Sequence, residues 1–508
     1  MTTSTIIVLI TMIVYLGGMV AIGIAYNRRS KGGSAEFFLG GRQLSPLVTA
    51  MSAEASDMSS YLLMGLPGLA LLCGLAEVSW TVIGLAVGTY LNFLLVARRL
   101  RRYSAGIGAI TIPDYFTRRF HDKRAVLSLV SALVIVIFFV PYTASGFSAV
   151  GKLFSSLFGW DYHLAMIIGA VVIVTYTVLG GFMAVSTTDL IQSIVMTVAL
   201  LVIVVFGIRT AGGWSNVVQN AQALPGYLDL TKGYIPETGT AGTFGFVPIV
   251  STLAWGLGYF GMPHILLRFM AIRNESEVKT SRRIASIWVV ISMAVAVLIG
   301  VIGYSVVKEL SIDLQDSETI VVELAKLMSK HSALLAVVGG VVLSGILAAT
   351  MSTADSQLLA ASSSVSKDLL QDFFHIKIGE KAAIVTARVT VVLIAVVALF
   401  LAWNPDSSVF RVVSFAWGGF GGAFGPIILF SLFWKRTNKW GAFAGMLAGG
   451  ATIFIWKFLV RPLGGVVDVY ELLPAFIVSC IAIVVVSLLT KAPDQEICDE
   501  FDKYAKIK

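Results

Sequence analysis

The chain alternates along its length between apolar runs of about twenty residues and short polar segments. A helix of that length crosses about 30 Å of hydrocarbon, so each run predicts a membrane-spanning α-helix. We predict thirteen spans, at residues 6–26, 44–70, 75–97, 125–154, 164–182, 189–208, 245–271, 284–307, 333–362, 382–402, 407–433, 441–459 and 470–490. The pattern therefore indicates an all-α, polytopic protein of the lipid bilayer.

Composition supports this class of protein. Hydrophobic residues make up 57% of the 508 residues, charged residues only 13%, and the mean hydropathy is +0.87. Soluble domains usually carry about 25% charged residues. The net charge of +8 comes from Lys and Arg in short clusters between the apolar runs, which is typical of topology signals and not of a nucleic-acid-binding face. Cys73, Cys480 and Cys498 match neither metal nor disulfide spacing, and we assign them no role.

Lys and Arg concentrate in alternate connecting segments. Clusters lie within 28–42, 98–124, 273–283 and 435–439, whereas 155–163 and 403–406 contain no Lys or Arg. By the positive-inside rule the rich segments are cytoplasmic, which predicts an external N-terminus and a cytoplasmic C-terminal tail at the cell membrane. The segment 308–332 departs from the rule, since it is expected outside yet carries three lysines.

Two spans contain residues that hydrocarbon tolerates poorly. The second span carries Glu54, Asp57 and four serines between positions 52 and 61, and one acidic residue at this depth costs about 2.5–3.5 kcal/mol on insertion scales. The seventh span carries three glycines and a proline between Trp255 and Pro263. Non-helical backbone at membrane depth persists only where it is buried in protein or lines a cavity.

The two interrupted spans lie five spans apart, so they cross the membrane in opposite directions. Paired interruptions in oppositely oriented halves indicate a transporter of inverted repeats, with its binding site near the bilayer midplane. The alternative is a pair of kinked helices that pack through small residues.

The ninth span has a hydroxyl-rich face. Ala349, Ser352 and Ser356 are spaced i, i+3 and i+7, so they share one side of a helix, with Thr353 beside them. Hydroxyl and freed carbonyl oxygens are ligands that a small hard cation prefers. The alternative is that these hydroxyls bond to carbonyls of their own helix, as Ser and Thr often do in membranes.

Motifs for other functions are weak. Gly256, Gly258 and Gly261 match the spacing G-x-G-x-x-G, but no strand precedes them and they lie within an apolar run, so dinucleotide binding is not indicated. The sequence contains no Walker A, H-E-x-x-H or nucleophile-elbow motif, and no repeated filter motif of a channel. Enzyme and channel functions are therefore disfavoured.

Nine segments spread over nearly the whole chain carry a family resemblance. They are FLGGRQLSP (38–46), SDMSSYLLMGLPG (56–68), TIPDYFTRRF (111–120), YTASG (142–146), VLGGFMAVSTTD (178–189), WGLGYFGMPHILLRFMA (255–271), ILAATMST (346–353), FAWGGFGGAFGP (415–426) and GAFAGMLAGG (441–450). Together they resemble the sodium/solute symporter family. The segments at 56–68 and 255–271 are closest to its proline-transporting branch.

The resemblance implies a core of five plus five helices in inverted repeats, of the leucine-transporter type. Residues 1–43 would form an extra helix and a cytoplasmic loop. Residues 44–243 would form the first repeat with a long external loop, and 244–434 the second repeat. Residues 435–508 would form two additional helices and a cytoplasmic tail.

The resemblance also carries over a set of sodium ligands, position by position. They are the backbone carbonyls of Ala55, Met58 and Ala349 and the hydroxyls of Ser352 and Thr353. Some relatives have a second sodium site, whose positions fall here on Asp189, Asp355 and Ser356 together with Ser352, although Asp355 stands where the family has a serine. An equal alternative is that Asp189 is a carboxylate near the cytoplasmic face, paired with a basic residue such as one of a loop.

Substrate-side positions of the proline branch carry over in the same way. They fall on Asp57, Ser59, Ser60, Tyr61, Tyr142, Trp255, Tyr259 and Pro263. The chain departs from the family pattern at Ser60 and Tyr61, where glycine and tryptophan are usual, and at Glu54, where a small residue is usual. Three roles for Glu54 stay open: a protonated acid, a partner of a cation, or an attractor of sodium.

The function implied by the resemblance is secondary active transport. We expect the chain to import L-proline by sodium symport through alternating access, with Na⁺ as coupling ion and no indication of an obligate protein partner. The alternative is a sodium symporter of the same fold for another small amino or organic acid.

Overall fold

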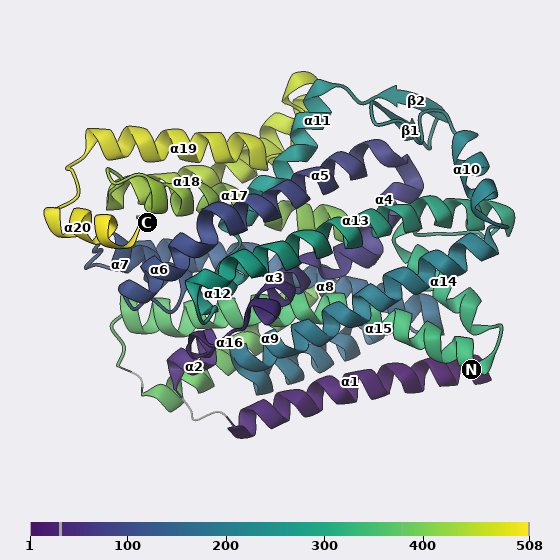
Figure 1. The fold of residues 1–508 in the computed structure, drawn as a ribbon, viewed down its shortest axis with the longest axis horizontal. Helices are drawn as coiled ribbons and strands as arrows, with labels where there is room; N and C mark the ends of the chain where they lie inside the picture. The colour runs from purple at the N-terminus through teal and green to yellow at the C-terminus, as the bar shows by residue number, and fades with distance from the viewer. Residues whose placement is uncertain (1, 30–32, 378, 506–508) are drawn as a thin grey trace.

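The computed structural model describes residues 2–29, 33–377 and 379–505. Lys31, which belongs to the predicted charge cluster at 28–42, lies outside the described residues. Most helices run along one long axis of the molecule, and the chain begins at one end of this axis and finishes near the other (Figure 1).

The longer helices are α1 (Thr3–Arg29), α3 (Pro46–Ser60), α5 (Leu75–Leu91), α8 (Val126–Phe158), α9 (Tyr162–Thr210), α13 (Val278–Glu309), α15 (Ala333–Ser363), α16 (Glu380–Leu401), α17 (Val409–Phe433), α18 (Lys439–Ile455) and α19 (Leu472–Leu489). The shorter helices are α2 (Ser34–Leu39), α4 (Leu66–Cys73), α6 (Arg98–Gly106), α7 (Ile112–Arg119), α10 (Trp214–Gln222), α11 (Phe246–Leu253), α12 (Pro263–Ala271), α14 (Ile320–Ser329) and α20 (Gln495–Tyr504).

Tighter 3-10 turns and wider π turns connect or interrupt these helices. They are η1 (Gly40–Arg42), η2 (Tyr61–Gly65), η3 (Asn92–Ala97), η4 (Ala254–Gly261), η5 (Glu275–Glu277), η6 (Ser317–Thr319), η7 (Ser364–Phe373), η8 (Trp456–Val460), η9 (Arg461–Leu463) and η10 (Gly465–Val467). The predicted all-α fold has one small addition, a hairpin of β1 (Lys232–Ile235) and β2 (Thr240–Thr243), in which Lys232 pairs with Thr243.

The predicted spans all coincide with helices. Among the described residues, ten helical segments are long and apolar enough to cross a membrane, and 246–261 with 263–271, bent by 48°, makes an eleventh. The two remaining predictions fall on α3–η2–α4, which is polar and broken, and on 162–178, which is shorter than the others. The count of thirteen therefore includes two spans that are not single long apolar helices. One is polar and broken, and the other is short.

The connection predicted at 183–188 is wrong, because the chain is helical there. The fifth and sixth spans meet instead at Gly181, whose φ of 70° and ψ of 177° interrupt α9. Only glycine adopts this backbone conformation readily. A Cβ at Gly181 would also lie 3.0 Å from the Phe37 ring of α2, so the site leaves little room for a side chain.

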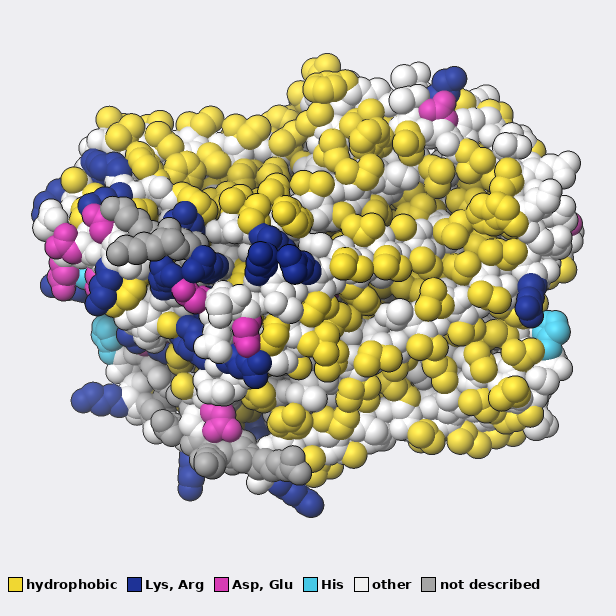
Figure 2. Space-filling model, viewed as in Figure 1, with side chains coloured by type: hydrophobic (Ala, Val, Ile, Leu, Met, Phe, Trp, Pro, Cys, Tyr) yellow, Lys and Arg dark blue, Asp and Glu magenta, His cyan; other side chains and the backbone are white. Residues whose placement is uncertain are grey.

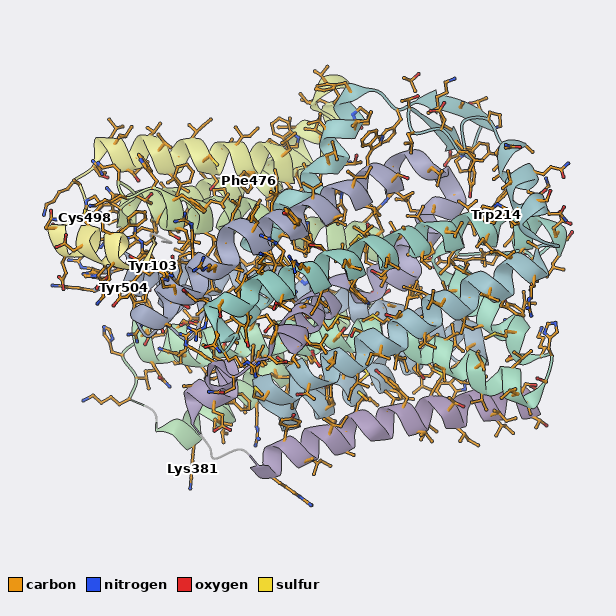
Figure 3. All side chains as sticks on the ribbon, viewed as in Figure 1. Tyr103, Trp214, Lys381, Phe476, Cys498 and Tyr504 are labelled. Atoms are coloured by element: carbon orange, nitrogen blue, oxygen red, sulfur yellow. The ribbon has the colours of Figure 1, made fainter. Side chains whose placement is uncertain are left out.

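The surface divides into two regions. Figure 2 shows a broad hydrophobic surface over most of the visible face, as a lipid-facing protein requires. Lys and Arg gather at the end of the molecule that holds α6, α7 and α20 (Figures 1 and 2). At that end α20 packs on α6, where the rings of Tyr103 and Tyr504 lie 5.7 Å apart (Figure 3).

Glycines let the interrupted seventh span lie directly against its neighbours. A Cβ at Gly88 of α5 would lie 2.4 Å from the carbonyl oxygen of Gly256 in η4. A Cβ at Gly256 would in turn lie 2.2 Å from the carbonyl oxygen of Gly84. Small residues of this kind allow backbones to approach closely in membranes, where packing replaces the hydrophobic effect as the driving force between helices.

We expect Gly88→Val to force α5 away from η4 and to lower stability by about 1–3 kcal/mol, the usual range for overpacking. The measurement is the apparent melting temperature of the purified protein in detergent. The matched control is Gly17→Val, because a Cβ at Gly17 of α1 has no atom within 4 Å. Equal melting temperatures for the two variants would contradict the close contact.

Candidate functional site

The helix of the second span is interrupted in the middle of the polar segment. Ser45 caps α3 by accepting a hydrogen bond from the Val48 amide, with Pro46 at the first helical position. The helix then breaks at Ser59, whose φ of 48° and ψ of −171° are strained for a residue other than glycine. The Ser59 hydroxyl accepts a hydrogen bond from the Tyr61 amide at 3.1 Å, which partly compensates for the lost helical bonds.

The helix of the seventh span is also interrupted. Residues 254–261 form the tight turns of η4, and Met262 is extended, with φ of −77° and ψ of 108°. Pro263 then occupies the first position of α12, where its missing N–H costs nothing. Both interruptions predicted from the sequence are therefore present.

Four of the five predicted sodium ligands meet where α15 crosses α3. The Ser352 hydroxyl donates to the Ala55 carbonyl at 2.7 Å, and Ser352 and Thr353 each reach the Ala349 carbonyl at 3.2 Å. The bonds to Ala349 are the within-helix bonds that the alternative predicted. The bond from Ser352 to Ala55 joins α15 to α3, so hydrogen bonding within a single helix does not account for it. The fifth ligand, the Met58 carbonyl, accepts from the Tyr61 amide at the start of η2.

Asp189, predicted as part of a second sodium site, is bound by an arginine. Its Oδ2 accepts hydrogen bonds from the Ser52 hydroxyl at 2.6 Å and from Arg268 Nη2 at 3.1 Å. Asp189 and Arg268 are 0% and 1% exposed, so this is a fully buried ion pair. The alternative of a paired carboxylate is therefore observed, with the difference that Arg268 lies on α12 and not in a loop.

Arg268 connects three spans through its guanidinium. Besides Asp189 of α9, it donates to the Ser52 hydroxyl of α3 at 3.0 Å and to the Ser356 hydroxyl of α15 at 2.5 Å. Its guanidinium carbon also lies 5.1 Å from the centre of the Phe182 ring. Ser356 and Asp189 are two of the predicted ligands of a second sodium, and here the guanidinium lies against both.

Asp355, the other predicted member of that set, is partly satisfied. Its Oδ1 accepts from the Ser356 hydroxyl at 3.3 Å, whereas its Oδ2 is buried without a hydrogen-bond partner among the described residues. Within the described residues, Arg268 supplies one positive charge to this group of two aspartates, and its ion pair is with Asp189.

The predicted substrate residues form an aromatic enclosure. The Tyr61 and Trp255 rings stack with centroids 5.7 Å apart, and Phe410 of α17 lies 5.6 Å from Tyr61 and 5.4 Å from Trp255. Tyr259 meets Trp417 edge to face at 5.0 Å. Phe410 and Trp417 were not predicted as site residues, because they come from the eleventh span and carry no polar signal.

Asp57 lies at the centre of the hydrogen bonds in this enclosure. The Tyr259 hydroxyl donates to its Oδ2 at 2.5 Å, and the Tyr142 hydroxyl donates to its backbone carbonyl at 3.2 Å. Three interrupted or kinked spans are thus tied together, since Tyr142 follows Pro141 within α8.

Five predicted residues take no part in the hydrogen bonds to Asp57: Ser59, Ser60, Tyr61, Trp255 and Pro263. The hydroxyls of Ser60 and Tyr61 are buried without a hydrogen-bond partner among the described residues. Pro263 begins α12 and is buried, but no recorded contact joins it to Asp57. The polar positions that differ from the family pattern, Ser60 and Tyr61, are therefore those whose hydroxyls have unused bonding capacity.

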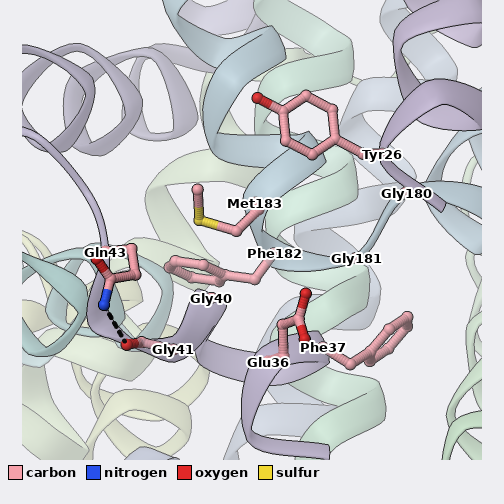
Figure 4. A pocket seen from close by; sticks show the side chains of 10 residues that line it. All are labelled: Tyr26, Glu36, Phe37, Gly40, Gly41, Gln43, Gly180, Gly181, Phe182 and Met183. Atoms are coloured by element: carbon pink, nitrogen blue, oxygen red, sulfur yellow. Dashed lines mark hydrogen bonds between the residues drawn. The ribbon is translucent and has the colours of Figure 1, made fainter. Parts of the chain in front are cut away.

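Protein covers this enclosure at both ends. Asp57, Tyr61, Tyr142, Trp255 and Tyr259 are at most 6% exposed. A described cavity of about 440 Å³ lies elsewhere, between α2, η1 and the Gly181 turn of α9, and is lined by Glu36, Phe37 and Phe182 among others (Figure 4). The enclosure therefore holds its residues out of contact with bulk solvent.

At the Lys- and Arg-rich end, hydrogen bonds hold the backbone around Ile272 to the segment before α3. The Leu44 amide donates to the Ala271 carbonyl at 3.1 Å, and the Arg273 amide donates to the Leu44 carbonyl at 3.0 Å. Arg42 adds hydrogen bonds to the carbonyls of Met270 and Ala109. Nearby, the Arg102 guanidinium holds the pKa of the Glu275 carboxyl below its usual value.

At the opposite end, Glu318 of η6 joins its own turn to α8 and to the start of α17. Its carboxylate accepts from the Val409 and Phe410 amides at the start of α17 and from Lys152 Nζ of α8 at 2.8 Å. A carboxylate at a helix N-terminus satisfies amides that have no partner within the helix. Neither Glu318 nor Lys152 was predicted as a functional residue.

Comparison with known proteins identifies close relatives. A family model described as the sodium:solute symporter family matches residues 37–449. An osmoregulated proline transporter, OpuE, of Bacillus subtilis is 42% identical over 488 residues, which cover 96% of this chain and 95% of that protein. A sodium/proline symporter of Staphylococcus aureus is 39% identical over 505 residues, which cover 98% of this chain and 96% of that protein.

Solved structures match the fold. A Na⁺-coupled sialic acid symporter superimposes with a TM-score of 0.77 at 18% identity, over 96% of this chain and 99% of that chain. Mhp1, a nucleobase-cation-symport-1 family transporter, gives a TM-score of 0.56 at 14% identity, over 92% of this chain and 98% of that chain. The predicted leucine-transporter-type fold is thereby confirmed.

We expect Arg268→Gln to destabilise the protein by about 3–5 kcal/mol, because it leaves the Asp189 carboxylate buried without its cation. The measurement is again the apparent melting temperature in detergent. Arg268→Gln combined with Asp189→Asn should recover much of the loss, since neither charge then remains.

The matched control is Arg124→Gln, which removes an exposed arginine and should leave the melting temperature unchanged. If the double variant is no more stable than Arg268→Gln alone, Asp189 is not the group that Arg268 neutralises.

Proposed function

This chain belongs to the sodium:solute symporter family, and we propose that it imports L-proline together with sodium by alternating access. It is a membrane transporter and not an enzyme. Two relatives that align over nearly their whole length are named a proline transporter and a sodium/proline symporter. The observation that carries the proposal is the hydrogen bond between Ser352 and the Ala55 carbonyl, because it brings four oxygen ligands together at the break in α3.

The sodium ion would bind where this hydrogen bond now lies. The carbonyls of Ala55, Met58 and Ala349 and the hydroxyls of Ser352 and Thr353 offer five oxygens, the ligand type that a hard cation selects. An ion that displaces the Ser352 bond would hold α3 to α15 in its place. Sodium binding would therefore stabilise the arrangement of α3 that shapes the substrate enclosure.

Proline would bind next to the break, among Asp57, Ser59, Ser60, Tyr61, Tyr142, Trp255, Tyr259 and Pro263. Its carboxylate would lie near the freed backbone amides at the interruption, where the N-terminal end of a helix favours negative charge. The stacked Tyr61 and Trp255 rings would cover the pyrrolidine ring and face its ammonium group. Because binding free energies are reciprocal, sodium and proline would each tighten the other by the same factor.

The membrane potential supplies enough work for this cycle. One sodium ion that crosses about 100 mV gains about 2.3 kcal/mol. At about 1.4 kcal/mol for each factor of ten, this alone supports roughly 50-fold accumulation of proline. No ATP-binding motif is needed, in agreement with the lack of a Walker A sequence.

The orientation follows from the charge distribution. The end that holds α6, α7 and α20 gathers Lys and Arg, and the positive-inside rule makes this end cytoplasmic. The N-terminus would then lie outside and the C-terminal tail inside the cell membrane. Residues 44–243 and 244–434 would be the two inverted repeats, with 1–43 and 435–508 as additions at either side.

We expect Ser352→Ala and Thr353→Ala each to raise the sodium concentration for half-maximal proline uptake by about 10-fold, the effect of losing one good ligand. The measurement is uptake of labelled proline into proteoliposomes as sodium is varied. The matched control is Ser344→Ala on the same helix, whose hydroxyl bonds only to the Gly340 carbonyl at 2.8 Å and should not affect the sodium dependence.

Uptake that continues unchanged when potassium replaces sodium would refute the coupling ion. An unchanged sodium requirement in both ligand variants would refute the assigned site while leaving sodium symport intact.

We expect Tyr61→Phe to retain proline uptake, because the Tyr61 hydroxyl has no hydrogen-bond partner among the described residues and the stacked ring is kept. Tyr61→Ala should raise the KM for proline about 10-fold or more, since it removes the ring that stacks on Trp255. Loss of uptake in the Phe variant would show instead that the hydroxyl binds the substrate, and would favour a more polar amino or organic acid as cargo.

A further inference from the structure

The indole of Trp255, a proposed substrate residue, is held by rings from several parts of the chain. It stacks on Tyr61 of the second span with centroids 5.7 Å apart, and the Phe410 ring of α17 lies 5.4 Å away. A third ring, that of Tyr470, lies closer than either, with its centroid 5.2 Å from the indole and its plane tilted by 25°. Among the described residues no ring contact joins Tyr61 to Tyr470, so the two rings meet different parts of the indole.

Tyr470 comes from a part of the chain that the proposed mechanism does not use. It lies between η8 and α19, in the region that follows the two proposed repeats. The start of α19 lies beside α11, the outer part of the interrupted seventh span (Figure 1). The Tyr470 ring is only 4% exposed. The enclosure around Trp255 therefore includes a residue that neither proposed repeat contains.

Hydrogen bonds fix Tyr470 at both ends. Its amide donates to the Ser251 hydroxyl of α11 at 2.7 Å, and its own hydroxyl donates to the Ser414 carbonyl of α17 at 2.6 Å. Gly418 of α17 leaves room for the ring, since a Cβ there would lie 3.2 Å from the Tyr470 hydroxyl. A ring that is bonded through its backbone and through its far end has little freedom to turn away from Trp255.

A buried carboxylate anchors the segment that carries Tyr470. The next residue, Glu471, is 0% exposed, and its Oε2 accepts a hydrogen bond from Arg461 Nη1 at 3.0 Å. Lys457 Nζ of η8 lies 3.4 Å from Oε1 of the same carboxylate, and Arg461 also pairs with Asp468 at 2.9 Å. Because a buried carboxylate is costly to separate from its cations, these pairs hold the backbone at Tyr470 in place.

We propose that Tyr470 is a positioning residue for substrate binding, whose ring holds the Trp255 indole in the orientation that covers proline. The proposal rests on the proposed function, because it takes proline to bind against Trp255. Tyr470 acts through the indole and not by bonding to the substrate, since its amide and its hydroxyl already donate to other residues. The region after the second repeat would then contribute to the affinity for the substrate.

Positioning of this kind acts on the affinity for proline. An indole that is already held in its binding orientation loses little freedom when the substrate arrives, so less of the binding free energy is lost in ordering it. Without the Tyr470 ring, Trp255 has space to turn, and the substrate must order it. The proposed sodium ligands lie on α3 and α15, so the binding of sodium without proline should not change.

The alternative is that Tyr470 only fills space before α19. A residue of that kind affects the stability of the protein and the amount of active transporter, and hence the maximal rate of uptake. It has no specific effect on the KM for proline. A positioning residue changes the KM, and it does so only while the Trp255 indole is present to be positioned.

The test measures the KM for labelled proline in proteoliposomes at saturating sodium, with the melting temperature in detergent as a check on folding. We expect Tyr470→Leu, which lacks the ring, to raise the KM about 10-fold, and Tyr470→Phe, which keeps the ring, to have a KM near that of the wild type. The matched control is Tyr504→Leu, which removes a C-terminal ring that lies 5.7 Å from Tyr103 at the Lys- and Arg-rich end and should leave the KM unchanged.

A milder variant keeps the proposal testable if Tyr470→Leu does not fold. Ser251→Ala removes the acceptor of the Tyr470 amide and leaves every ring in place. We expect it to raise the KM in the same direction, by about 3-fold, the effect of one lost hydrogen bond.

The dependence on Trp255 gives a second readout. In a Trp255→Leu background, Tyr470→Leu should change the dissociation constant of labelled proline by less than about 2-fold, because the indole that it positions is gone. The same loss of affinity in both backgrounds would show that Tyr470 acts by another route, and would overturn the proposal.

Other outcomes overturn the proposal in distinct ways. An unchanged KM in Tyr470→Leu, with a lowered melting temperature, would make Tyr470 a packing residue. Equal increases of the KM in the Leu and Phe variants would assign the effect to the hydroxyl and not to the stacked ring. A wild type without sodium-dependent proline uptake would refute the proposed function itself, whereas normal uptake by the wild type with an unchanged KM in the variants would refute only the role of Tyr470.

Discussion

The structure depends on how it neutralises charge that lies far from water. Asp189 is fully buried, and Arg268 reaches it from another span while also bonding to Ser52 and Ser356. Buried ion pairs contribute little net stability but become very costly when one partner is lost. The guanidinium therefore acts less as a source of stability than as a constraint, because α3, α9, α12 and α15 must stay together as long as Asp189 is buried.

The two ends of the molecule are closed by different kinds of interaction. At the Lys- and Arg-rich end, backbone hydrogen bonds around Leu44 and Ile272 and carbonyl contacts of Arg42 join the segment before α3 to the end of α12. At the other end the Glu318 carboxylate both caps α17 and pairs with Lys152, which also pairs with Asp316. Opening the first end would break backbone hydrogen bonds, whereas opening the second would separate the Glu318 side chain from Lys152 and from the start of α17. Alternating access needs a barrier at each end, and the two barriers here are built from different interactions.

Much of this architecture could be predicted from the sequence, and there are physical reasons why the rest could not. The spans follow from apolar runs, and the interruptions at Ser59 and at η4 follow from polar and glycine-rich segments that hydrocarbon excludes. The turn at Gly181 was misplaced because residues 183–188 are polar enough for a loop yet pack inside the protein as helix. Arg268 was overlooked although an arginine within an apolar segment is itself a signal of function. Its partners, like those of Glu318, lie on other spans, and no local pattern predicts which distant carboxylate a side chain will meet.

The same principle of charge balance distinguishes two neighbouring groups of acids in this protein. Around Asp189 and Asp355 the protein supplies its own cation, so an ion there would have to displace a guanidinium held by three hydrogen-bonding partners. Around Glu54 and Asp57 no side-chain cation is recorded within the described residues, and oxygens of Thr89 and Asn92 remain unpartnered. A fixed positive charge makes a structural link between helices, whereas a buried acid without one is stable only when its charge is neutralised or hydrogen-bonded. Arg268 therefore joins the helices around Asp189, and the burial of Glu54 places a different demand on the protein, since no described side chain donates to its Oε2.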